Sequence, residues 1–211
     1  MSPRALLLEP WVQLLGSDPD VVGAGGELLD RYAEPHRRYH DLRHLAEVLH
    51  AVRAMADGEV PAAVLLAAYW HDAVYDPAAG DNEERSAALA DRTLTRLGRP
   101  AAEVGEVVRL VLLTRTHDPD EGDGAGALFC DADLAILAAP PDRYRSYARD
   151  VRQEYGHLSD EVFREGRADV LRALARHEDL FRTAEGRRRW EAAARQNLQS
   201  ELDELGAAPP P

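Results

Sequence analysis

Residues 62–76, AAVLLAAYWHDAVYD, are the stretch that decides the fold. Residues 62–70 are all apolar or aromatic, so they predict a helix that is buried on every side at the centre of the protein. Pro61 stands just before this helix, a favoured place for proline. We expect the helix to run from Ala62 to Val74. It would then carry His71 and Asp72 at its end, where ionisable groups are costly unless they are paired or bind a metal.

The remaining sequence is also typical of helices. Alanine, leucine, arginine and glutamate are strong helix formers, and no segment shows strand alternation or an internal repeat. The predicted fold class is all-α, a single bundle of about eight to ten helices over residues 1–205, with residues 206–211 as a disordered tail. The expected helices are 5–15, 20–33, 36–56, 62–74, 81–97, 101–116, 127–137, 143–155, 160–177 and 184–205.

Composition excludes several function classes. The 211 residues suit one domain, and the formal net charge of −13 disfavours binding to a nucleic-acid duplex or an acidic membrane. Cys130 is the only cysteine, so no intrachain disulfide can form, and we expect it to be a small buried residue. No apolar run has the length of a signal-peptide core or a membrane span. A cytoplasmic location is therefore expected.

Three short segments carry the residues for chemistry: YHDLRH at 39–44, the His71-Asp72 pair, and CDADL at 130–134. His40 and His44 are four residues apart, so on a helix they would share one face. Imidazole and carboxylate groups together suit a cation that polarises phosphate oxygens. We expect one divalent metal ion (Mn, Fe, Zn, Ni, Co or Mg) that binds a small phosphorylated substrate.

These segments resemble motifs of the HD superfamily of metal-dependent phosphohydrolases, which are all-α proteins. The order of ligands in that superfamily is His, then His-Asp, then Asp, and it is matched here by His44, His71, Asp72 and Asp133. The outer segments also resemble motifs of cyclic-nucleotide phosphodiesterases. By that likeness His44 binds the metal and His40 protonates the leaving oxygen. The register with His40 as the ligand fits the general superfamily pattern too.

From Arg38 to about Glu201 the chain is similar to a small bacterial group of predicted HD phosphohydrolases. The similar segments are 71–76, 81–87, 114–117, 152–155 and 194–198. This resemblance implies an HD-type helical bundle. It also implies a hydrolase that acts on a phosphate ester or anhydride, in a nucleotide or another small phosphorylated metabolite. The fold is implied more directly than the reaction, because one fold hosts many reactions.

The chain departs from some HD proteins in ways that bear on its chemistry. Two-metal members carry further histidines soon after the His-Asp pair, and residues 73–82 contain none. A single cation is therefore expected, although Asp76 and His117 offer groups for a second one. Tyr75 stands where (p)ppGpp-hydrolysing members carry a glutamate, which counts against that activity.

Other residues have expected roles around the metal. Asp76 or Glu83 would accept a proton from the attacking water, and His40 would donate one to the leaving group. Arginine forks bind phosphate well, and Arg167 is a further candidate for that contact. The expected substrate-binding residues are Arg38, Tyr75, Asn82, His117 and Arg152. A loop, helix-start or surface role remains the alternative for each of these residues.

Two other functions use the same fold. A nucleotide-binding sensor, or a degenerate HD domain without hydrolysis, would keep the same ligands. An HD-fold di-iron oxygenase would need more histidines than this segment offers. The metal, the substrate and the oligomeric state are left open by the sequence.

Overall fold

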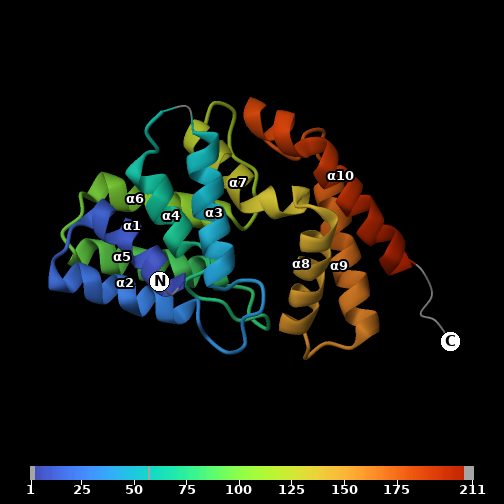
Figure 1. The fold of residues 1–211 in the computed structure, drawn as a ribbon, viewed down its shortest axis with the longest axis horizontal. Helices are drawn as coiled ribbons and strands as arrows, with labels where there is room; N and C mark the ends of the chain where they lie inside the picture. The colour runs from blue at the N-terminus through green and yellow to red at the C-terminus, as the bar shows by residue number, and fades with distance from the viewer. Residues whose placement is uncertain (1–2, 57, 207–211) are drawn as a thin grey trace. The chain divides into compact units, whose positions relative to one another are not determined.

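A computed structural model describes residues 3–56 and 58–206. These residues form ten α-helices and one short 3-10 helix without a strand (Figure 1), so the all-α prediction is confirmed. The chain divides into two compact units, the first ending at Asp133 and the second beginning at Leu134. The expectation that residues 1–205 form one HD-type domain stays a prediction. Among the described residues, no helix has the length and hydropathy that crossing a bilayer requires.

The first unit is built around the apolar helix at residues 62–70. Its helices are α1 (Pro3–Leu15), α2 (Pro19–Arg31), α3 (Leu42–Met55), α4 (Ala62–Trp70), α5 (Asn82–Arg96), α6 (Ala101–Leu113) and α7 (Gly124–Asp133). Helix α4 contacts α3, α5, α6 and α7 (Figure 1). Val64 and residues 66–70 are buried, but Ala62, Ala63 and Leu65 are only half-buried, so the helix is buried on most of its surface rather than on every side.

Helices α1 and α2 anchor the end of α4 that leads to His71. Trp11 of α1 is fully buried, and its Nε1 donates to the Val21 carbonyl at 2.8 Å. A Cβ at Gly25 would lie 2.5 Å from the Trp11 ring, so glycine allows this close packing. The Tyr69 hydroxyl donates to the Leu7 carbonyl at 2.7 Å, which ties α4 to α1.

Several expected helix boundaries were wrong, and three of the differences bear on the site. Helix α3 begins at Leu42 rather than at residue 36, because the Asp41 side chain caps it. Helix α4 ends at Trp70 rather than at Val74, and the next residues form a turn. The expected helix at 127–137 is divided at Asp133, where α7 gives way to the 3-10 helix η1 (Leu134–Ala138).

The second unit comprises η1, α8 (Pro141–Glu154), α9 (Asp160–Ala175) and α10 (Ala184–Gly206). Helix α10 contacts both η1 and α9. The Asn197 side chain donates to the carbonyls of Leu137 and Ala139 at 2.8 and 2.9 Å, which joins α10 to the end of η1. Helix α10 continues through Gly206, and the rest of the predicted tail lies outside the described residues.

Candidate metal centre

The turn before α3 sets the position of His44. The Asp41 carboxylate accepts hydrogen bonds from the backbone N–H groups of Arg43 and His44 at 2.8 and 3.2 Å. This cap begins the helix after His40, so His40 lies outside α3. The expectation that His40 and His44 share a helix face was therefore wrong. His44, in the first turn of α3, is only 3% exposed.

Four side chains of the first unit converge. His44 Nε2 and His71 Nε2 are 3.0 Å apart. Asp133 Oδ1 lies 3.2 Å from His44 Nε2 and 3.4 Å from His71 Nε2. Asp72 Oδ2 lies 3.3 Å from His44 Nε2 and 3.1 Å from His71 Nε2. His44, His71 and Asp133 form a group whose ligand atoms all lie within 4.8 Å of one another, and Asp72 stands outside that group of three.

The protonation of His71 shows why these atoms suit a cation. His71 Nδ1 lies 2.9 Å from the Ala68 carbonyl, which can only accept, so Nδ1 carries the proton. In the neutral ring Nε2 is then left with a lone pair that faces His44 and two carboxylates. A ring held by its second nitrogen on a backbone carbonyl is the usual arrangement of a metal-binding histidine.

The spacing of the three atoms in this group also fits one metal ion. Two ligand atoms about 2.1 Å from a cation, with an angle of about 90–110° between them, are about 3.0–3.4 Å apart. His44 Nε2, His71 Nε2 and Asp133 Oδ1 are separated by 3.0, 3.2 and 3.4 Å. The buried group of His44, His71 and Asp133 can therefore hold a metal ion, and Asp72 Oδ2 lies beside both histidines.

The field inside the group favours positive charge. Burial alone would lower the pKa of His44, but the hydrogen bonds that its ring donates to Asp133 and Asp72 outweigh it and raise the pKa to about 9. The pKa of His71 is also raised, because Asp72 and Asp133 outweigh the effect of burial. Burial would raise the pKa of both carboxyls, yet the neighbouring histidines hold them well below the usual value. These shifts all describe a pocket that attracts a proton or a metal ion.

Arg37 fastens the two ligand-bearing segments together. Its guanidinium, with a fully buried side chain, pairs with Glu34 at 3.1 Å. It also donates to the carbonyl of His40 at 3.0 Å and to those of Asp72 and Ala73 at 2.7 and 3.3 Å. The sequence prediction named the exposed neighbour Arg38 instead of Arg37. Nothing in the sequence around these two adjacent arginines indicates which one is buried.

Two more side chains hold the turn after α4. The buried Tyr32 hydroxyl accepts from the Asp72 N–H at 3.3 Å and donates to the Tyr69 carbonyl at 3.1 Å. The buried Ser86 hydroxyl accepts from the Val74 N–H at 2.9 Å and donates to the Val74 carbonyl at 3.3 Å. Tyr32 and Ser86 are therefore positioning residues that only the three-dimensional structure reveals.

His117 contacts Asp133, one of the candidate metal ligands, rather than lying on the surface. Its Nε2 lies 2.9 Å from Asp133 Oδ2, so Asp133 presents its other oxygen, Oδ1, to His44 and His71. His117 has φ 51°, the single positive φ at a non-glycine residue in the described part of the chain. Strain of this kind persists where the surrounding structure enforces it, which is common at functional sites.

His40 and Tyr75 lie at the edge of the group. Their rings stack with centroids 4.1 Å apart. The His40 ring centroid is 5.7 Å from that of His44, and its charge contributes to the lowered pKa of Asp72. The structure thus places His40 beside the ligands but outside the group of three.

The other expected site residues have structural contacts, lack a contact with the ligands, or belong to the second unit. Asp76 Oδ1 accepts from the Ala78 N–H at 3.0 Å, and Asn82 bonds both backbone groups of Asp76 at 2.9 and 3.0 Å. Glu83 is half-buried in the first turn of α5, and no hydrogen bond or ion pair within the described residues joins it to the ligands. Arg152 belongs to the second unit, where it pairs with Asp160.

The chain was compared with protein-family models, curated proteins and solved structures, and none of them matches it. The geometry of the group is therefore the ground for any functional assignment.

Proposed function

We propose that this protein is a metal-dependent phosphohydrolase of the HD type, acting on a nucleotide or another small phosphorylated metabolite. The observation that carries the proposal is the convergence of His44, His71 and Asp133, whose ligand atoms lie 3.0–3.4 Å apart inside an all-α unit, with Asp72 beside both histidines. The order of these ligands along the chain is the one that the HD resemblance implies. This order supports a site of the HD type, and the experiment below separates hydrolysis from the other functions of such a site.

A divalent cation held by these residues would supply Lewis acidity and a water of lowered pKa. The chain itself supplies orientation. Three side chains, Arg37, Tyr32 and Ser86, hold the turn that carries Asp72. His117 contacts Oδ2 of Asp133, which leaves Oδ1 facing the histidines. His40 is proposed as the general acid, because it lies beside the ligands and is held by its stack on Tyr75. Asp76 and Glu83 stay candidates for the proton acceptor.

The test is a turnover screen of the protein reconstituted separately with Mn, Fe, Zn, Ni, Co and Mg. The substrates are nucleotides, dinucleotides, ppGpp and sugar phosphates, and metal content is measured on the same samples. We expect one metal ion per chain and turnover of at least one phosphate ester or anhydride. Tight nucleotide binding without turnover under every metal would contradict the proposal and favour the sensor function. Two redox-active irons per chain would favour the oxygenase.

His40→Ala then tests the mechanism. A general acid contributes about 10²–10⁴-fold, so turnover of a substrate with a poor leaving group should fall by that factor while the metal is retained. A nitrophenyl phosphate needs little protonation and should lose much less. An equal loss for both substrates would remove the general-acid role. Loss of the metal would instead make His40 the first ligand.

A further inference from the structure

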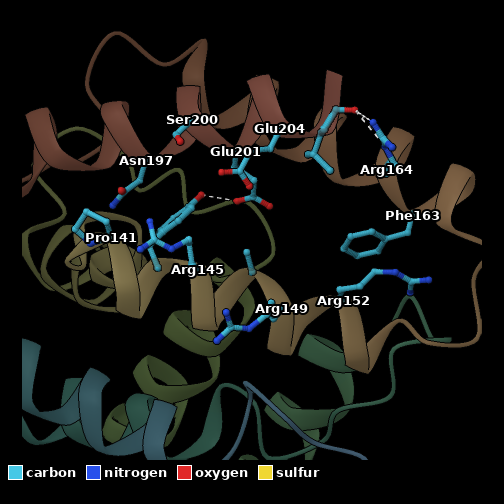
Figure 2. Close-up of a pocket in the computed structure, with 13 residues that line it drawn as sticks. Pro141, Arg145, Arg149, Arg152, Phe163, Arg164, Asn197, Ser200, Glu201 and Glu204 are labelled. Carbon is cyan, nitrogen blue, oxygen red and sulfur yellow. Dashed lines mark hydrogen bonds between the residues drawn. The ribbon is translucent and has the colours of Figure 1, made fainter. Parts of the chain in front are cut away.

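The second unit contains a groove of about 480 Å³ between α8, α9 and α10 (Figure 2). This volume falls in the range of pockets that bind small molecules. One wall is α8, which contributes Arg145, Arg149 and Arg152, and the opposite wall is α10, which contributes Ser200, Glu201 and Glu204. Helix faces that pack directly against each other are usually apolar. These two facing stripes are charged, so they suit a polar ligand better than close helix packing.

Most of the charges in the groove already have partners. Arg145 forms an ion pair with Asp142, and Arg152 pairs with Asp160 at 2.7 Å. Glu201 accepts from Arg167 at 2.8 Å and from Tyr144 at 2.6 Å. Within the described part of the chain, no hydrogen bond or ion pair joins Arg149 or Glu204 to another residue.

The groove also has an apolar section. Phe163 of α9 is buried, with the Arg152 guanidinium 4.8 Å from its ring centroid. Ala148 on α8 and Leu205 on α10 line the same groove. A ligand in this groove therefore meets a cation on one wall, a carboxylate on the other and apolar side chains as well.

We propose that this groove binds a small organic anion with an apolar body. Its carboxylate or phosphate-type group would pair with the Arg149 fork, whose planar donors match either anion. Glu204 on the opposite wall would favour a hydrogen-bond donor at the other end of the ligand and repel a second negative charge. The net charge of −13 repels anions in general, so binding here has to come from the local arginines. This site lies within the second unit and does not depend on the proposed hydrolase activity.

Calorimetric titration of the full chain tests the proposal, with benzoate and phenylphosphonate as probes and benzyl alcohol as the uncharged analogue. Phenylphosphonate has no ester bond to hydrolyse, and the two probes separate a carboxylate ligand from a phosphate-type one. We expect saturable binding of at least one anion and none of the alcohol. Arg149→Ala should weaken that binding about 10-fold or more. Arg172→Ala removes an arginine of α9 that pairs with Asp169 outside the groove, so it should leave binding unchanged.

A second pair of probes tests the wall that carries Glu204. 4-(Aminomethyl)benzoate should bind more tightly than terephthalate, and Glu204→Gln should reduce that preference. Absence of saturable binding of both anions to the unmodified chain would overturn the proposal. Anion affinity in Arg149→Ala equal to that of the unmodified chain would also overturn it. Binding that is lost in Asp72→Ala and kept in Arg149→Ala would do the same, because it would assign the probe to the metal centre.

Discussion

Each of the two units buries a cluster of ionisable side chains, and the clusters differ in whether donors match acceptors. In the second unit, Glu201 accepts from Arg167 at 2.8 and 3.1 Å and from Tyr144 at 2.6 Å. Arg167 also donates to the Tyr147 hydroxyl at 3.0 Å. Every strong donor therefore faces an acceptor. This arrangement is a structural ion pair, and the expectation of a phosphate contact for Arg167 has no support in it.

The cluster of the first unit has no such match. His71 Nε2 carries a lone pair, and it faces His44 Nε2 and two carboxylates within 3.4 Å. With both rings neutral, acceptors outnumber donors in this cluster, so it takes up a proton or a cation, and the raised pKa values of His44 and His71 reflect this. Burial and charge alone thus do not identify a metal site. An excess of hydrogen-bond acceptors over donors is the feature that distinguishes the first cluster from the second.

The largest expected effect is on metal binding. Replacing His71 or Asp72 with alanine should abolish tight binding of the cation, since loss of an outer partner alone lowers affinity by about 10–100-fold. The protein should stay folded, because α4 keeps its apolar packing. His50, an exposed residue of α3, gives the matched control, and His50→Ala should retain one metal ion per chain. Metal analysis after dialysis measures the outcome. Stoichiometric metal in both ligand variants would refute the assignment.

The second effect is on stability. Arg167→Ala should lower the free energy of unfolding by about 3–5 kcal/mol, because it leaves the buried Glu201 carboxylate without its ionic partner. Arg172→Ala on the same helix removes an exposed pair and should change it by at most about 1 kcal/mol. Chemical denaturation measures both variants. Metal content should be unaffected in both variants. Loss of the cation from Arg167→Ala would contradict the assignment of metal binding to the first cluster alone.

The sequence predicted the elements better than it predicted their contacts. Periodicity and the apolar run at residues 62–70 were enough for ten helices, because helix formation and burial depend on local pattern. Residue types marked the three segments as candidates for metal binding, and the resemblance to the HD superfamily selected His44, His71 and Asp133 within them. Cys130 is buried as expected.

What the sequence could not supply are contacts made to backbone groups far along the chain. Arg37 and Arg38 are identical in type, and only the fold shows that Arg37 reaches the carbonyls of Asp72 and Ala73. Asn82 was expected to contact substrate, but both ends of its amide bond the backbone of Asp76. Helix α3 was expected to begin at residue 36, and the Asp41 cap shortened it. Each case depends on one side chain's orientation, which periodicity does not encode.

The third prediction concerns pH. His44 has a pKa of about 9 in the folded metal-free protein, above its ordinary value of 6.5. Its contribution to stability is therefore complete below pH 6.5 and is lost as the pH rises through 9. The free energy of unfolding of the metal-free protein should fall by about 3 kcal/mol over that range. His44→Ala should remove the share due to His44 and leave that of His71, whose pKa is also raised, whereas His50→Ala should keep the full dependence.

The same titration should act on the metal in the opposite direction. Protons compete with the cation for the histidine nitrogens, so metal affinity should rise from pH 6.5 to pH 9. Arg167 adds no pH dependence to stability in this range. Tyr147 and Glu201 outweigh burial and raise the pKa of its guanidinium further above an already high value. Metal affinity that is flat between pH 6.5 and 9 would mean that the cation binds elsewhere.

The smallest effect separates the two features of His117, its hydrogen bond to Asp133 and its positive φ. His117→Ala and His117→Gly both remove the hydrogen bond, so both should lower metal affinity by about 10–100-fold. Glycine adopts φ 51° without strain and alanine does not, so the glycine variant should be more stable than the alanine variant by about 1 kcal/mol. If the side chain orients Asp133, the two variants share one metal affinity despite their different stabilities. If the glycine variant instead kept the affinity of the unmodified protein, the backbone conformation of the loop would be what matters, and His117 would not be a positioning residue.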